Sequence, residues 1–424
     1  MQNNIDFINT PVVDVVNKII YDSARIGASD IHFDHTDTCL KVRIRIDGVL
    51  NDYIDIPNEV KNNVITRIKI LSGMNITETR LPQDGAIKTN LSGLDLDMRV
   101  SSLPTKKGEK IVIRILDYSR SLKGIEYLYF SEDNYKKVLK MISVPNGIIL
   151  VTGATGSGKS TTVYSFLQKL NVKGSNLITV EDPVEMDIEG INQVQVNSEI
   201  GLDFATVLRS ILRQDPNVIM IGEIRDSETA QIAVRASITG HLVLSTLHTN
   251  NSLTTIERLL DMEVERYLLA SALTGIVSQK LARKLCDKCK KQRALTPYEQ
   301  EMFKKFLDID VTTVYEAVGC PHCSGGYHGR IAVQEVLLLS PQIKDAINAK
   351  IPKAKLRELV YSDDVITLLQ DGLYKVIAGL TTISEVIKLT EADDEINSIE
   401  RIQAEHRKKE NDENTPEEIP KEDF

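Results

Sequence analysis

Residues 153–160 read Gly-Ala-Thr-Gly-Ser-Gly-Lys-Ser, which is the pattern G-x-x-x-x-G-K-[ST] without interruption. The apolar run at 148–151 precedes this stretch and predicts a short buried strand, and residues 161–167 are helical in character. A strand, a glycine-rich loop and a helix in this order form a P-loop, whose backbone N–H groups wrap around a phosphate chain. A tight glycine turn is the alternative, but the fixed positions and both flanks favour a nucleoside triphosphate site.

We expect the residues of this loop to have separate roles. Lys159 is expected to reach the β- and γ-phosphates of the nucleotide, and Ser160 is expected to ligate Mg²⁺. The glycines permit close approach of the backbone, and the start of the following helix favours negative charge. The nucleotide-binding candidates in the loop are Gly153, Thr155, Gly156, Ser157, Gly158, Lys159, Ser160 and Thr161.

Length and charge limit the class of protein. A chain of 424 residues suggests two to three domains, and it contains neither a membrane-length apolar run nor a signal peptide. We therefore expect a cytoplasmic protein with at most peripheral membrane contact. Of the net charge of −9, the segment 391–424 carries −8, from 13 acidic and 5 basic residues. We expect this acidic tail to be disordered, with a helix at most around 396–406.

The pattern of apolar residues predicts two folded α/β parts. Residues 1–118 are expected to form the first domain, followed by a linker at 119–128 and a second domain at 129–390. The first domain is expected to contain helices near 12–20 and 59–71 and strands at 31–33, 40–46, 49–54, 95–101 and 110–116. In the second, strands at 148–151, 177–180, 218–221 and 242–246 alternate with helices. This alternation predicts a mostly parallel sheet, followed by short helices over 340–390.

Acidic residues follow two of the strands predicted for the second domain. Glu181 and Glu185 come after the second strand and Glu223 after the third. The carboxyl ends of neighbouring parallel strands face the nucleotide crevice. We therefore predict Glu223 as general base or water positioner, with Glu181 or Glu185 supporting the metal. For any one of them alone, an ordinary acidic loop residue is the alternative.

Histidines and arginines supply further candidates. His241 and His248 bracket the fourth strand and could sense the γ-phosphate, with a capping or core role as the alternative for each. Arginines flank the third strand or end strands of the first domain, and a γ-phosphate needs countercharge. From spacing alone a surface role is favoured for all five: Arg99, Arg114, Arg209, Arg213 and Arg225.

Four cysteines predict a metal site. Cys286-x-x-Cys289 and Cys320-x-x-Cys323 are two thiol pairs, 30 residues apart, and a helix over 297–307 can fill the spacer. Four thiolates on two turns suit a closed, structural Zn²⁺ site, with zinc knuckle boundaries at 283–330. Disulfides and unrelated buried cysteines are the alternatives, and the remaining Cys39 is expected only to pack.

Together these motifs resemble the secretion ATPase superfamily, specifically the type II secretion and type IV pilus assembly ATPases. The resemblance rests on the P-loop, on Ile178–Glu185, on Gly222–Asp226 and on Thr239–Thr249 in this order, and the segments at 28–32 and 80–85 also look like the family's N-terminal domain. It covers about residues 10–390. It implies a PAS-like N-terminal domain, a RecA-like ATPase domain and a hexameric ring, with ATP between the domains. The five arginines and both histidines match family positions near the nucleotide or in the acidic segments.

The family implies a mechanical output. Its domain rotations turn an inner-membrane platform protein that adds pilin subunits to a filament, so we expect a motor at the inner face of the cytoplasmic membrane. The paired cysteines are similar to assembly and secretion members, whereas retraction members usually lack them. The PAS-like domain starts almost at once, so we expect a short form without the additional N-terminal domain. A nucleic-acid motor and a non-hydrolysing nucleotide-gated scaffold are the alternatives, and without a basic stripe we expect no nucleic-acid partner.

Overall fold

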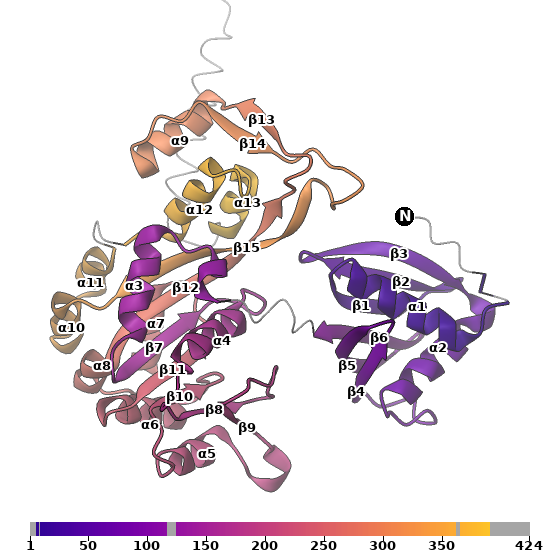
Figure 1. Ribbon diagram of the computed structural model, residues 1–424, viewed down its shortest axis with the longest axis horizontal. Helices are drawn as coiled ribbons and strands as arrows, with labels where there is room; N and C mark the ends of the chain where they lie inside the picture. The colour runs from indigo at the N-terminus through magenta and orange to yellow at the C-terminus, as the bar shows by residue number, and fades with distance from the viewer. Residues whose placement is uncertain (1–5, 8, 117–123, 362–364, 391–424) are drawn as a thin grey trace, which may run out of the picture. The chain divides into compact units, whose positions relative to one another are not determined.

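The computed structural model describes residues 6–7, 9–116, 124–361 and 365–390, and the predicted acidic tail with its helix lies outside these residues. The chain divides into two compact units, Met1–Ser121 and Leu122–Phe424 (Figure 1). Each has a sheet and a hydrophobic core of its own. No helix in the described part of the chain combines the length and the apolar character needed to cross a lipid bilayer.

The N-terminal unit is a six-stranded antiparallel sheet with two helices. The strand order is β3-β2-β1-β6-β5-β4. The helices are α1 (Val12–Arg25) and α2 (Asn58–Leu71). The strands are β1 (Ala28–His35), β2 (Cys39–Ile46), β3 (Val49–Pro57), β4 (Gln83–Leu91), β5 (Leu94–Thr105) and β6 (Gly108–Leu116).

Alternation along the strands decides which face of this sheet is covered. In β1 the side chains of Ile31 and Phe33 are fully buried in one core cluster with residues of α1 and α2. Their neighbours Asp30, His32 and Asp34 point to the other face, because successive side chains of a strand alternate. A single apolar face packed under two helices gives this unit its α/β form.

The C-terminal unit is built on a seven-stranded sheet of order β15-β12-β7-β11-β10-β8-β9. Every neighbouring pair is parallel except β12 with β15, which confirms the predicted mostly parallel sheet. The predicted strands recur as β7 (Gly147–Thr152), β8 (Leu177–Glu181), β10 (Val218–Ile221) and β11 (Leu242–Leu247). The others are β9 (Asn192–Gln195), β12 (Leu273–Leu285) and β15 (Tyr327–Leu338).

Helices cover both faces of this sheet (Figure 1). One core cluster joins β7, β8, β10 and β11 to helices on one face, which are α5 (Phe204–Ile211), α6 (Ser227–Ile238), α7 (Ser252–Asp261), α8 (Arg266–Ala272), α10 (Pro341–Asn348) and α11 (Lys353–Val360). The other face carries α3 (Glu132–Ile142) and α4 (Lys159–Leu170), and the short helix η2 (Ile125–Leu128) contacts α4. A second short helix, η3 (Ser198–Ile200), precedes α5.

The cysteine-bearing insertion lies between the antiparallel strands β12 and β15. It contains the two-stranded sheet β13 (Lys291–Ala294) with β14 (Thr313–Glu316), and α9 (Pro297–Leu307), which has the bounds predicted for the spacer helix. A separate core cluster packs this insertion against α12 (Leu368–Ile377) and α13 (Ile383–Thr390). The insertion therefore folds together with α12 and α13 beside the main sheet.

The edge strand β15 is closed by side chains. The backbone N–H of Gln334 donates to Asp371 Oδ2 at 2.7 Å, and the backbone carbonyl of Gln334 accepts from Asn134 Nδ2 at 3.2 Å. Asp371 also pairs with Lys375, one turn further along α12. Unpaired backbone groups on an edge strand invite pairing with another chain. At Gln334, side chains of α3 and α12 provide these partners.

Several strands are absent from the sequence-based description, namely β4, β9 and the pairs β12–β15 and β13–β14. Strand β4 begins Gln83-Asp84-Gly85-Ala86, which carries no apolar alternation. In β12, polar residues interrupt the apolar run, and its partner in β15 lies far along the chain, with Gln279 opposite Gln334. Such strands are defined by their tertiary neighbours more than by intrinsic preference.

Candidate nucleotide site and cysteine cluster

The site is built where the neighbouring parallel strands β7, β11 and β10 end. Leu247 pairs with Thr152 at the ends of β11 and β7, and Ile221 pairs with Ser245 in β10 and β11. Because parallel strands end at the same edge of a sheet, the segments that follow them are neighbours. The P-loop follows β7, Glu223 follows β10 and His248 follows β11.

The P-loop joins β7 to α4 as the sequence predicts. The N-cap of α4 is Gly158, which has φ +87° and provides no side-chain cap. The first backbone N–H groups of a helix have no partner within the helix, so an uncapped N-terminus is suited to an anion. The loop therefore offers both a turn that favours glycine and open donors for phosphate.

Lys159 lies folded against the start of its own loop. Its Nζ donates to the carbonyls of Gly153 at 2.9 Å and Ala154 at 3.1 Å. Burial lowers the pKa of Lys159, and the negative charges of Glu223 and Glu185 oppose this effect. The ammonium group is thus held by two carbonyl oxygens that a phosphate oxygen could replace.

Glu223 lies between the side chains of Arg225 and His248. Its Oε1 accepts a hydrogen bond from Arg225, and its Oε2 lies 3.3 Å from His248 Nε2. Burial acts to raise the pKa of Glu223, but the hydrogen bond and charge of Arg225, with a smaller contribution from His248, leave it below its usual value. Arg225 also lies 3.9 Å from Asp182 Oδ2. Glu223 is therefore an ionised carboxylate whose orientation is set by its neighbours.

Glu181 and Glu185 occupy different environments. Glu181 is only 3% exposed and accepts hydrogen bonds from Tyr164, from Thr179 Oγ1 at 2.6 Å and from Gln193 Nε2 at 3.0 Å. Burial, followed by the negative charge of Glu181, raises the pKa of Tyr164. Glu185 is exposed. Only Glu185 therefore presents an open carboxylate, whereas Glu181 holds the end of β8 to α4 and β9.

The two histidines lie at opposite ends of β11. His248 follows the strand and contacts Glu223, whereas His241 precedes it, with Nδ1 2.9 Å from the Ala236 carbonyl. A strand of this length spans about 20 Å. The structure therefore brings His248 to the P-loop edge of this unit and places His241 at the other edge.

The five predicted arginines are distributed over both units. Arg225 joins the Glu223 cluster, while Arg209 pairs with Glu228 of α6, and Arg213 donates to the Arg209 carbonyl at 2.8 Å. Arg99 and Arg114 belong to the N-terminal unit, where they are directly opposite in β5 and β6. Arg114 is 63% exposed and donates to Asp30 Oδ1 at 3.0 Å.

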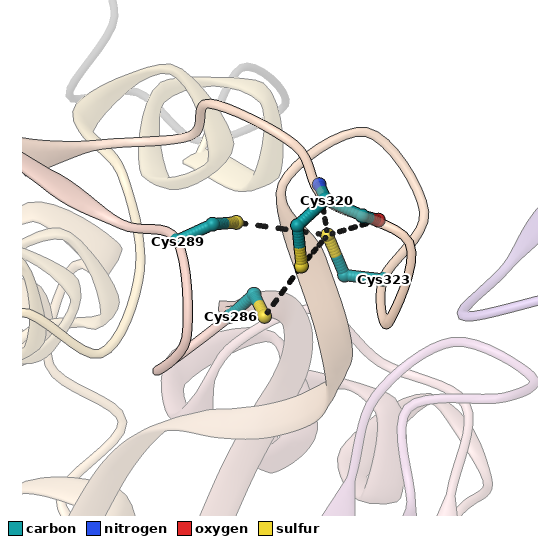
Figure 2. Close-up of side chains that lie close together, drawn as sticks. All are labelled: Cys286, Cys289, Cys320 and Cys323. Carbon is teal, nitrogen blue, oxygen red and sulfur yellow. Dashed lines mark hydrogen bonds between the residues drawn. The ribbon is translucent and has the colours of Figure 1, made fainter.

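The four predicted cysteines form one cluster (Figure 2). Cys286 and Cys289 follow β12, and Cys320 and Cys323 precede β15. Within each pair, the backbone N–H of the second cysteine donates to the backbone carbonyl of the first at 3.2 Å, which closes a tight turn. Sγ separations are 3.9 Å for Cys286 to Cys320 and 3.7 Å for Cys289 to Cys323 and for Cys320 to Cys323. These exceed the ~2.05 Å of a disulfide and fit the ~3.8 Å between sulfurs of a tetrahedral Zn²⁺ site.

Sequence patterns did not single out three side chains that shape the nucleotide site. Gln279 of β12 contacts the P-loop, Tyr164 of α4 contacts Glu181, and Asp182 lies near Arg225. Asp182 belongs to the acidic segment Ile178–Glu185. A buried amide or phenol carries no local signal of its own, because its partners are far away in the sequence.

The sequence of this chain is similar to those of known secretion and pilus proteins. Residues 8–388 match the family described as Type II/IV secretion system protein. The chain is 44% identical over 397 residues to the putative type II secretion system protein E of Escherichia coli, covering 92% of this chain and 80% of the relative. It is 43% identical over 385 residues to the type IV pilus assembly ATPase PilB of Pseudomonas aeruginosa, covering 90% and 68% of the two chains.

Two solved structures are similar over most of their length. The Legionella pneumophila ATPase DotB has a TM-score of 0.67 at 20% identity, covering 92% of this chain and 98% of that one, which shows the shared fold. The pilus retraction motor PilT with bound ADP has a TM-score of 0.59 at 26% identity, covering 88% and 96%. The α/β architecture predicted from sequence is therefore shared with the solved structures of an ATPase and of a pilus retraction motor.

Proposed function

The chain belongs to the type II/IV secretion system protein family and is an ATPase, and from this premise we propose that it powers assembly of a type IV pilus or a related pseudopilus. The observation that carries the proposal is the meeting of the P-loop with Glu223 and His248 at adjoining strand ends. The similarity to type II secretion protein E and to PilB supports an assembly or secretion role.

We propose that ATP is hydrolysed by in-line attack of water at this edge of the sheet. Lys159 exchanges its two carbonyl partners for the β- and γ-phosphates, and Glu223 orients and deprotonates the attacking water. When bound, Mg²⁺ neutralises charge on the phosphates, and Ser160 and the exposed Glu185 are its candidate partners. The structure favours Glu185 over Glu181 for this task, because the carboxylate of Glu181 already accepts three hydrogen bonds.

The arginines are proposed to act within a homo-hexamer. Arg225 steadies Glu223 in its own subunit. Arg99 and Arg114 neutralise charge that develops on the γ-phosphate, since arginines supplied by another domain or subunit can couple hydrolysis to movement. We propose only a supporting role for Arg209 and Arg213. His241 lies at the edge of the sheet opposite the P-loop.

The cysteine cluster is proposed to hold Zn²⁺ with Cys286, Cys289, Cys320 and Cys323 as ligands. All four sulfurs lie within 4.8 Å of one another, and four protein ligands leave no open position for a reactant. The ion would therefore have a structural role, tying the ends of β12 and β15 together.

The proposed partner is a polytopic inner-membrane platform protein of a pilus or secretion machine. The motor would then work at the inner face of the cytoplasmic membrane, attached through its partner. The named relatives, which belong to type II secretion systems and to type IV pili, support this setting.

The experiment that tests this function is Lys159→Ala in the native copy, with surface filaments imaged by electron microscopy. Lys169→Ala, an exposed lysine of the same helix α4, is the matched control. We expect filaments to disappear in Lys159→Ala cells that still contain the protein, and to persist in the control. An excess of filaments in the Lys159→Ala cells would identify a retraction motor and overturn the proposal.

A further inference from the structure

The strand β12 runs alongside the P-loop. Its last pair with β7 is Ser278 with Thr152, so the next residue, Gln279, lies level with the start of the loop. A Cβ placed on Gly153 would lie 2.4 Å from the backbone carbonyl oxygen of Gln279. A Cβ placed on Gly158 would lie 3.2 Å from the side-chain Nε2 of Gln279. Gly153 and Gly158 therefore both pack closely against Gln279.

The side chain of Gln279 is hydrogen bonded at both ends of its amide. Its Nε2 donates to the Ser157 carbonyl at 2.7 Å, and its Oε1 accepts from Thr162 Oγ1 at 2.8 Å. Gln279 and Thr162 are each 1% exposed. Because a backbone carbonyl can only accept, the nitrogen of the amide must face Ser157. The orientation of this amide is thus determined by its partners.

This contact sets the direction of one peptide group in the loop. In a trans peptide the carbonyl and the following N–H point in opposite directions. With the Ser157 carbonyl directed toward β12, the Gly158 N–H is directed away from it, and this N–H has no acceptor among the described residues. A reversed peptide would present a carbonyl oxygen in place of a donor, which would repel a phosphate.

We propose that Gln279 is a positioning residue that holds the Ser157–Gly158 peptide with its N–H turned toward the phosphates of the bound nucleotide. The inference rests on the proposed nucleotide site and names a residue outside the P-loop that prepares it. Preorganised donors bind charge more tightly because no reorganisation is needed on binding. The contact is made before the reaction begins, so it strengthens binding of nucleotide and transition state alike.

The test compares Gln279→Met with a matched change at Gln334 in the full chain. Methionine keeps the size of the side chain but removes the donor and the acceptor. Gln334 lies opposite Gln279 in β15 and is equally buried, and its Nε2 donates to the Leu128 carbonyl of η2 at 3.1 Å. Gln334→Met therefore controls for the general cost of losing a buried amide.

Two readouts separate positioning from stability. We expect Gln279→Met to raise the Kd for fluorescently labelled ADP and the KM for ATP about tenfold, with kcat nearly unchanged. This pattern is expected when an interaction that stabilises the bound nucleotide and the transition state equally is lost. Gln334→Met should lower the unfolding temperature of the nucleotide-free protein without changing the Kd. Gln279→Glu, which keeps the acceptor for Thr162 and replaces only the donor, is the second variant if Gln279→Met does not fold.

Equal ADP binding by wild type and Gln279→Met would overturn the inference while leaving the proposed function intact. An equal loss of affinity in Gln334→Met would also overturn it, because the effect would then belong to the fold and not to the loop. Failure of the wild-type chain itself to bind ADP would instead refute the nucleotide site on which both proposals rest.

Discussion

At the scale of single residues, carboxylates that look alike in sequence differ in their surroundings. Glu181 is enclosed by three hydrogen-bond donors, Glu185 is exposed, and Glu223 is half-buried between Arg225 and His248. A general base must be ionised and oriented toward the attacking water. Glu223 meets the first requirement because Arg225 holds its pKa below the usual value.

The change Glu223→Gln tests this assignment. We expect ATP hydrolysis to fall by at least about 100-fold, since the amide cannot accept the proton of water, with ADP binding unchanged. Steady-state phosphate release and labelled ADP binding provide the two measurements. Glu189→Gln, which changes an exposed acidic residue between β8 and β9, should retain wild-type turnover. Undiminished turnover in Glu223→Gln would remove the residue from the mechanism.

At the scale of elements, β12 connects the nucleotide loop with the cysteine cluster. Gln279 contacts the P-loop, and Cys286 directly follows the end of the strand. Between them, Lys280 Nζ donates to the Leu389 carbonyl near the end of α13 at 2.7 Å, and Arg283 pairs with Glu385 of the same helix. One strand therefore contacts the P-loop and α13 and leads directly into the cysteine cluster.

Removing one thiolate should release the end of this strand. We expect Cys286→Ser to lose zinc and to lower the unfolding temperature by at least about 5 °C, because a structural site contributes folding energy. Elemental analysis and thermal unfolding check the two effects. Cys39→Ser in the N-terminal unit is the control and should keep the wild-type metal content. Stoichiometric zinc in Cys286→Ser would refute the four-cysteine site.

At the scale of the whole molecule, the catalytic candidates are divided between two separately folded units. Lys159, Glu223 and His248 lie in the C-terminal unit, whereas Arg99 and Arg114 lie in the N-terminal one. Within the proposed hexamer, the arginines of one subunit are expected to serve the nucleotide of a neighbour. Hydrolysis would then depend on how subunits associate and not only on the residues of a single chain.

Mixing two inactive variants tests this division of labour. Arg114→Gln keeps an intact nucleotide site, and Glu223→Gln can still supply Arg114 to its neighbour. Random co-assembly should therefore restore activity at about a quarter of the sites. A mixture of Glu223→Gln with Lys159→Ala is the control and should stay inactive, because both changes damage the same site. No recovery in the first mixture would argue against an arginine acting between subunits.

The sequence alone was enough to predict the features that depend on local chemistry. The P-loop, the four strands around it, the helix at 297–307 and the two cysteine pairs all follow from residue types at fixed short spacings. Their physical basis is short-range: glycines permit the turn, apolar runs form buried strands, and paired thiols suit a metal. The mixed α/β fold and the secretion ATPase family could be predicted for the same reason.

Only the tertiary structure decided which candidates share the site. Strand length and direction separate His241 from His248, although both flank β11 in sequence. Burial and three donors from α4, β8 and β9 distinguish Glu181 from Glu185. Gln279 reaches the P-loop because β12 lies beside β7 in the sheet, although the two strands are more than a hundred residues apart in the chain. Such contacts depend on strand order and register, which local sequence patterns do not encode.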